Sequence, residues 1–217
     1  MDTVFQYSDV QLNGLLNAVY EEQKRRAQAK ATDPWSIIKG QEMAKRAALV
    51  AVAGHHSILF VGPPLQGKTM LRAACHDLGL VYSFEAWPCP CGHYGQLTQP
   101  CVCTPEMVRS YHERLSPTRI TVAMPVVPRR ELEVKRPGTG LADVESALRT
   151  MRRYHGQWLT EDVKTLLRAA ERDLGLLTGQ WDAIVDVART IANLDQSEQI
   201  MPSHVCEAIS YARRPLP

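Results

Sequence analysis

Apolar positions divide the chain into a mixed first part and a helical second part. A continuous apolar run at 58–61 predicts a buried strand, and runs at 80–86 and 120–127 predict two more. Strands that alternate with helices are typical of an α/β fold. The expected helices lie at 12–20, after a capping box at Ser8 and Gln11, in an alanine-rich stretch before Gly54, and at 70–78, 141–154, 160–174, 183–193 and 202–211.

The segment after the first strand carries the most specific motif. Residues 62–69, GPPLQGKT, match the P-loop pattern G-x-x-x-x-G-K-[ST] between a predicted strand and a predicted helix. Backbone N–H groups of such a loop face phosphate oxygens, the lysine reaches the β- and γ-phosphates, and the hydroxyl holds Mg²⁺. The alternative is a Gly/Pro turn that binds nothing. The expected nucleotide-binding residues are Gly62, Pro63, Pro64, Leu65, Gln66, Gly67, Lys68, Thr69 and Met70, with Thr69 also the magnesium ligand.

Composition sets only outer bounds. The 217 residues, 45% hydrophobic and 22% charged, can fold as one domain or two small ones. No apolar run approaches the roughly 18 residues of a membrane span, and the first residues, MDTVF, do not begin a secretory signal, so a cytoplasmic location is expected. A net charge of +2 does not imply a nucleic-acid partner. The basic run at 24–30 suits a helix C-terminus, with a phosphate-backbone contact as the alternative.

Four of the six cysteines lie close together after the second predicted strand. Cys89, Cys91, Cys101 and Cys103 form two C-x-C pairs separated by nine residues. In a reducing compartment two such pairs favour a metal over disulfides, and four thiolates favour tetrahedral Zn²⁺. His93 is a substitute ligand if one cysteine does not coordinate. Such a closed site leaves no position for water, so its expected role is structural.

Several of these motifs together resemble a known family. Gly40-Gln41-Glu42, the alanine-rich helix, a Gly-His pair and the Gly-Pro-Pro P-loop resemble the entrance of AAA+ ATPases of the magnesium-chelatase type. Residues 88–92, PCPCG, and 101–106, CVCTPE, resemble the cysteine-rich insertion of the branch that includes the competence-associated DNA branch-migration helicases. Residues 188–194, ARTIANL, and 200–208 resemble the family's helical lid. The resemblance covers about residues 35–212.

The resemblance implies the domain organisation. We expect an N-terminal amphipathic helix and basic linker at 1–33, a truncated P-loop NTPase core at 34–136 that includes a zinc loop at 87–106, and a helical lid at 137–217. The fold is then an AAA+-like α/β core with a small parallel sheet. Its strands correspond to the family's first, fourth and fifth, which are neighbours in a 5-1-4-3-2 sheet.

The chain departs from the family at three places in the nucleotide site. Between Gly79 and Leu80 a long segment is missing, including the acidic strand end that positions Mg²⁺ and the attacking water. Trp87 stands where the family has an Asn that senses the γ-phosphate, and residues 178–181, TGQW, contain no lid arginine. Glu85, near the end of the retained central strand, is the one local carboxylate that could substitute, so it is a candidate catalytic residue.

Four further residues have a functional and a structural interpretation. Residues 118–120 look like a shortened form of the segment that carries the family's trans-acting arginine finger, so Arg119 is the finger candidate, with an ordinary surface arginine as the alternative. His55 and His56 precede the P-loop strand, which favours a packing or adenine-side role over a ligand or base. Cys75 is expected to be an inert core thiol.

Three functional interpretations follow from these features. The favoured one is a module that holds ATP or ADP with Mg²⁺, hydrolyses it weakly or not at all, and acts by assembly with a second copy, a larger AAA+ protein or DNA. The alternative is an ATP-driven DNA-remodelling motor. A third interpretation is a zinc-stapled interaction domain with a vestigial P-loop.

Overall fold

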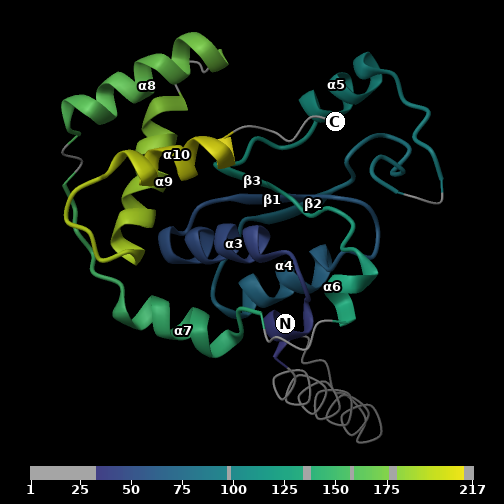
Figure 1. Cartoon of the computed structure of the whole chain (residues 1–217), viewed down its shortest axis with the longest axis horizontal. Coiled ribbons are helices and arrows are strands. Elements are labelled where there is room, and N and C mark those ends of the chain that lie inside the picture. The colour runs from purple at the N-terminus through teal and green to yellow at the C-terminus, as the bar shows by residue number, and fades with distance from the viewer. Residues whose placement is uncertain (1–32, 97–98, 134–137, 157–158, 176–179, 213–217) are drawn as a thin grey trace, which may run out of the picture.

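The computed structural model describes residues 33–96, 99–133, 138–156, 159–175 and 180–212 (Figure 1). The predicted helix at 12–20 and the basic run at 24–30 lie outside these residues. Among the described residues, no helix has the length and apolar character needed to cross a membrane.

The centre of the fold is a three-stranded parallel sheet. Its strands are β1 (Ile58–Val61), β2 (Ser83–Ala86) and β3 (Ile120–Ala123), in the order β2-β1-β3. The predicted α/β fold with a small parallel sheet is therefore confirmed. The position given to Glu85 in a central strand is wrong, because the P-loop strand β1 lies between the other two and β2 is at the edge.

The two outer strands are shorter than the apolar runs that predict them. The first part of the 80–86 run instead closes the preceding helix, where Leu80 N donates to Cys75 O at 3.0 Å and the Leu80 side chain is buried. The 120–127 run leaves the sheet before Pro125, which has no N–H for a ladder hydrogen bond. Local apolar content thus located the strands but not their ends, and within the 80–86 run Val81 and Tyr82 are exposed.

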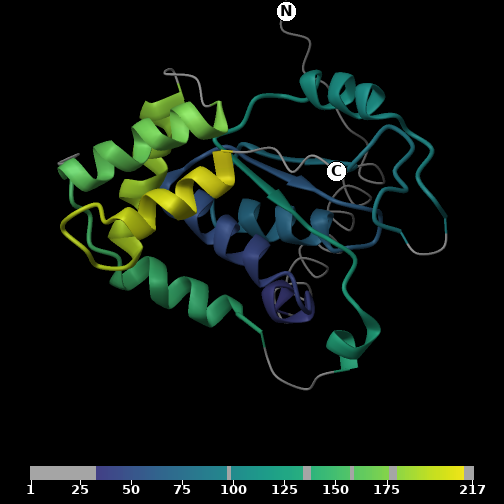
Figure 2. The same cartoon turned by 45° about the horizontal axis from the view of Figure 1, so that its top comes forward.

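Helices cover the two faces of the sheet unequally. Helices α3 (Glu42–Gly54) and α4 (Lys68–Asp77) pack on one face, and α5 (Pro105–Glu113) lies over the other (Figure 2). The main apolar core is on the α3 and α4 side, and it includes the fully buried Trp35 of the short helix α2 (Pro34–Ile37). On the α5 side a small cluster of Leu59, Val61 and Ala86 packs with Leu115. A further short helix, α6 (Arg129–Glu133), follows β3.

The C-terminal helices form the expected helical bundle beside the sheet. They are α7 (Leu141–Thr150), α8 (Glu161–Leu174), α9 (Trp181–Leu194) and α10 (Pro202–Ala212), here called the lid helices. Helix α9 packs on α3, and α10 packs on α9 and β3. Because one apolar cluster runs from α3 and β3 into α9 and α10, the sheet and the lid helices share a core.

Polar contacts join α9 to the end of α3 and to the start of β3. The Nε2 atom of buried His56 lies 2.8 Å from Thr190 Oγ1, and Arg119 pairs with Asp186 on the same helix at 2.5 Å. A Cβ atom on Gly54 would lie 2.3 Å from His56 Nε2, so this close approach requires glycine. Burial, helped by the positive charge of Arg119, lowers the pKa of His56 to about 4, while the charge of Asp186 opposes the shift and that of His55 adds to it.

The buried His56 makes stability depend on pH. Because its pKa falls from 6.5 to about 4 on folding, the unfolded chain binds more protons within that interval, and the free energy of unfolding should fall as pH is lowered from 6.5 to 4. The full loss is on the order of 3 kcal/mol. In urea unfolding at pH 4.5 to 7.5, His56→Gln, which does not titrate, should show a flatter pH dependence than the wild type. Equal slopes for the two proteins would contradict this origin of the acid sensitivity.

Candidate nucleotide-binding site

The P-loop leaves the middle strand of the sheet and runs directly into α4. Gly67 precedes Lys68, the first residue of α4, in a left-handed conformation (φ 87°), and a Cβ atom on Gly62 would lie 2.2 Å from Met124 O. Both positions therefore require glycine for different reasons, one conformational and one steric. Leu65, at the fully exposed tip, also has a positive φ of 64°, which is unusual for a leucine. The backbone of the predicted loop is thus held in a specific curved shape.

The Lys68 ammonium group lies across the loop. Its Nζ donates to Gly62 O at 2.8 Å and to Pro63 O at 2.6 Å, and the side chain is buried. Burial lowers the pKa of Lys68, and the charge of Glu85 opposes that shift. A phosphate oxygen at this position would gain a charge-assisted hydrogen bond from a lysine that the loop already orients.

Glu85 reaches α4 from the end of β2. Thr69 Oγ1 donates to Glu85 Oε2 at 2.8 Å, and Arg72 Nε lies 3.8 Å from Glu85 Oε1. The carboxylate therefore contacts the hydroxyl that the P-loop pattern assigns to Mg²⁺. A hydroxyl oxygen and a carboxylate oxygen this close are hard ligands of the kind that Mg²⁺ prefers. The structure brings together Lys68, Thr69 and Glu85, which the sequence singled out separately.

These side chains open onto a pocket of about 570 Å³. Its opposite wall comes from the cysteine loop and α5, through Trp87, Pro90 and Tyr111. Trp87 N donates to Tyr111 Oη at 3.3 Å. Sequence reasoning missed Tyr111, because none of the motifs in the sequence includes it. Among the described residues that line this pocket, Glu85 is the single carboxylate.

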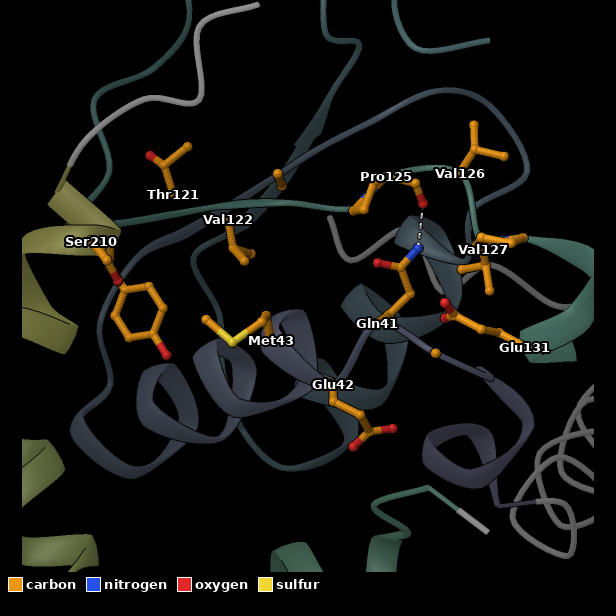
Figure 3. Close-up of a pocket in the computed structure, with 14 residues that line it drawn as sticks. Gln41, Glu42, Met43, Thr121, Val122, Pro125, Val126, Val127, Glu131 and Ser210 are labelled. Carbon is orange, nitrogen blue, oxygen red and sulfur yellow. Dashed lines mark hydrogen bonds between the residues drawn. The ribbon is translucent and has the colours of Figure 1, made fainter. Parts of the chain in front are cut away.

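A second, larger pocket of about 920 Å³ lies near the start of α3 (Figure 3). It is bounded by the start of α3, the chain that leaves β3, and α10, with Met43, Val122 and Tyr211 among its apolar walls. Gln41 crosses it to donate from Nε2 to Pro125 O at 2.7 Å. Val127 N donates to Gln66 Oε1 at 3.1 Å, which ties this wall to the P-loop. Apolar walls with a few polar groups are typical of small-molecule pockets.

The two histidines before β1 lie away from this pocket. His55 and His56 follow the C-terminal end of α3, whereas residues at its N-terminal end line the pocket. The packing role of His56 is supported by its contact with Thr190, and an adenine-side role is not. Cys75 is fully buried, and burial raises the pKa of its thiol to about 12, as expected for an inert core thiol.

The cysteine loop brings the four predicted ligands together. The sulfur atoms of Cys89, Cys91, Cys101 and Cys103 all lie within 4.8 Å of one another, and all four cysteines are free of disulfides. Tetrahedral zinc with bonds of about 2.3 Å needs sulfurs roughly 3.8 Å apart, so the cluster fits such an ion. Tyr94 N also donates to Cys89 Sγ at 3.4 Å. The substitute ligand His93 is outside the cluster, with Nδ1 3.3 Å from Gln96 Oε1.

Arg119 and the P-loop lie at opposite ends of the strands. Its backbone N donates to Ser57 Oγ, just before β1, whereas the P-loop begins after the last residue of β1. The length of that strand, roughly 13 Å at 3.3 Å per residue, separates the two positions. Arg119 is therefore not part of the P-loop site of its own chain. As a finger it would have to act on a second copy.

Two models of one protein family match the chain. The family model described as magnesium chelatase, subunit ChlI, matches residues 35–83 and 79–134, two segments that meet where the sequence predicts the deletion. The model of the ChlI C-terminal part matches residues 118–212. Together the two models extend from α2 to the end of α10.

Two curated proteins are similar to parts of the chain. Competence protein ComM of Haemophilus influenzae is 58% identical over 36 residues, 17% of this chain and 7% of that protein. The uncharacterized protein YifB of Escherichia coli is 30% identical over 149 residues, 57% of this chain and 29% of that protein. The chain thus spans less than a third of the length of these relatives. With both ChlI models matched and a P-loop on the central strand of a parallel sheet, the chain belongs to the magnesium-chelatase-type AAA+ family.

Proposed function

We propose that this chain is a nucleotide-responsive module that binds ATP or ADP with Mg²⁺ and acts through assembly with a partner. The observation that carries the proposal is the convergence of Lys68, Thr69 and Glu85 on one pocket at the P-loop. Lys68 would bind the β- and γ-phosphates, and the backbone N–H groups of residues 62–69 would surround them. Thr69 would hold Mg²⁺, with Glu85 beside it as the nearest carboxylate.

The larger pocket is the proposed site of the base. It flanks the P-loop through the hydrogen bond between Val127 and Gln66, and its apolar walls suit the faces of a purine. The backbone carbonyls and the Gln41 amide there offer hydrogen-bond partners to ring nitrogens. The proposed nucleotide therefore runs from this pocket, along the loop, to Glu85.

Slow hydrolysis follows from the shortage of acids. Phosphoryl transfer to water needs one group to hold Mg²⁺ and usually a second to orient the water. Glu85 is the single carboxylate among the described residues of the phosphate pocket, and its hydrogen bond to Thr69 commits it to the metal. An ATP-driven DNA-remodelling motor is the alternative, and it would need a second acid from outside this pocket.

We propose that nucleotide binding has its effect through assembly of the chain with a partner. Arg119 is half exposed and lies far from its own P-loop, so a role at a nucleotide would require a second copy or a larger AAA+ protein. DNA is a further candidate partner through the family resemblance. The zinc-stapled interaction domain with a vestigial P-loop remains the interpretation to adopt if no nucleotide binds.

Nucleotide binding is the first test of the proposal. Calorimetry should give micromolar dissociation constants for ATP and ADP with Mg²⁺, on the order of −7 to −8 kcal/mol. Lys68→Ala should abolish binding, because the buried ammonium group is the main positive charge of the pocket. Lys164→Ala, which removes an exposed lysine paired with Glu161 on α8, should bind like the wild type. The same absence of heat in all three proteins at millimolar nucleotide would make the loop vestigial.

Hydrolysis is tested separately from binding. Phosphate release should stay far below about 1 s⁻¹ for the wild type, with or without single-stranded or branched DNA, because one carboxylate must serve both metal and water. Turnover above that rate that disappears in Lys68→Ala and Glu85→Gln would favour the motor and make Glu85 its catalytic acid. Activity lost in Arg119→Ala and restored by mixing with Lys68→Ala chains would show an arginine that acts across a subunit boundary.

We propose Zn²⁺ as the occupant of the cysteine cluster, with a structural role. The protein purified under reducing conditions should contain about one zinc per chain, and Cys101→Ser should lose most of it and melt at a lower temperature. Cys206→Ser, which changes an exposed cysteine outside the loop, should retain the metal and the melting temperature. Elemental analysis that finds no metal in the reduced wild type would reject zinc.

A further inference from the structure

Tyr111 occupies the wall of the phosphate pocket that faces the P-loop. It comes from α5, whereas Lys68 and Thr69 come from the first turn of α4, and all three line the same pocket. We propose that the Tyr111 hydroxyl binds the γ-phosphate of ATP and so makes the site prefer ATP over ADP. The inference rests on the proposed nucleotide binding and adds to it the residue that distinguishes the two nucleotides.

The hydrogen bonding of the hydroxyl suits this role. Trp87 N is the donor in its bond to Tyr111 Oη, so the hydroxyl acts there as an acceptor. A phenol oxygen that accepts from an amide still has its own proton to donate. The acceptor expected in this pocket is a phosphate oxygen. A hydrogen bond to such a charged oxygen is stronger than one between neutral groups.

The position of Tyr111 explains why the contact is to the last phosphate. The P-loop backbone and Lys68 belong to one continuous segment, which contacts the β- and γ-phosphates from the α4 side of the pocket. Tyr111 approaches from a different element, on the β2 side of the site where Glu85 and Trp87 also lie. In the proposed orientation the base lies in the larger pocket and the phosphate chain ends near Glu85, so a group beside Glu85 is close to the last phosphate. ADP has no phosphate there.

The ring of Tyr111 is held in place by its neighbours. Helix α5 is capped by Thr104, whose side chain accepts from Met107 N, and it begins with Pro105. The next residue, His112, is buried, and its Nε2 lies 2.9 Å from Pro88 O. The rings of Tyr111 and His112 meet edge to face with centroids 5.6 Å apart. The hydroxyl is therefore positioned by the same loop that carries the cysteines.

Trp87 supplies its backbone rather than its side chain to this arrangement. The indole ring packs against Gly92, where an added Cβ would lie 3.3 Å from the ring, and the side chain is about half exposed. An indole has one N–H donor at the edge of a large apolar ring, which suits a phosphate poorly. The residue at the position of the family's Asn thus orients the Tyr111 hydroxyl through its amide.

The test compares two nucleotides on the full chain. Calorimetry with Mg²⁺ would measure ADP and a non-hydrolysable β,γ-imido analogue of ATP on the wild type, Tyr111→Phe and Tyr94→Phe. In Tyr111→Phe the analogue should bind about tenfold more weakly while ADP changes by less than about twofold, because one hydrogen bond to a charged group is lost. Tyr94→Phe, the same chemical change in the cysteine loop outside the pocket, should leave both constants unchanged.

Each other outcome counts against a stated idea. If the wild type binds both nucleotides and Tyr111→Phe leaves their affinity ratio unchanged, the γ-phosphate contact is wrong and the proposed function stands. An equal loss for both nucleotides would also reject the contact, since it would make Tyr111 part of the pocket wall only. If the wild type binds neither nucleotide, the proposed function and this inference fail together. Retained ADP binding in Tyr111→Phe shows that the variant is folded.

Discussion

The parallel, in-register pairing of the three strands is the constraint on which the site depends. Val61 of β1 is aligned with Ala86 of β2 and Ala123 of β3, so all three strands end at one edge of the sheet. The P-loop, the cysteine loop and the wall of the larger pocket leave the sheet together at that edge. Pockets at the carboxyl ends of parallel strands are the usual binding sites of open α/β sheets. Glu85, one residue before the end of β2, reaches Thr69 because of this alignment.

A short sheet is enough to position the phosphate residues, but it leaves one face thinly covered. The α3 and α4 side has the main apolar core, whereas among the described residues the apolar cluster on the α5 side is small, with Leu59, Val61 and Ala86 packed with Leu115. The cysteine loop and α5 lie on that side, joined by the contact between His112 and Pro88. A bound metal ion would order a segment rich in glycine and proline that has little apolar surface to bury. The same segment supplies Trp87, Pro90 and Tyr111 to the phosphate pocket, so metal and nucleotide are expected to affect each other.

Buried and exposed polar contacts join the lid helices to the other end of the sheet, where the strands begin. The contact between His56 and Thr190 is buried, and Gly54 makes room for it. The ion pair of Arg119 with Asp186 is partly exposed, and such pairs contribute only about 0–1 kcal/mol. If Arg119 left Asp186 to bind a nucleotide phosphate on a neighbouring subunit, the loss of this ion pair would therefore cost little free energy. Arg46 adds a second tie from α3 to the lid through Glu207 and Asp195.

The sequence alone determined the parts of this protein that short local motifs or helical periodicity specify. The apolar run before the P-loop located β1 to the residue, and the start of α4 was expected within two residues of where it lies, because glycine, lysine and threonine at fixed spacing describe one backbone shape. The four cysteines indicated their own cluster, since thiols at C-x-C spacing have few other uses in such a loop. Helical periodicity placed the lid helices within a few residues.

Only the tertiary structure decided which side chains from different elements come into contact. Sequence reasoning could name Glu85 as the nearest acid, but the 2.8 Å contact with Thr69 exists because β2 pairs directly with β1. It could not find Tyr111, whose place in the pocket follows from how α5 packs over the sheet. The family resemblance gave the strand order correctly, since 5-1-4 corresponds to the observed β3-β1-β2, but the strand of Glu85 was described as central and is at the edge. The role of His56 was likewise settled by α9, a helix far away in the chain. A motif specifies the shape of its own backbone, whereas a site assembled from several elements is specified by the packing that brings them together.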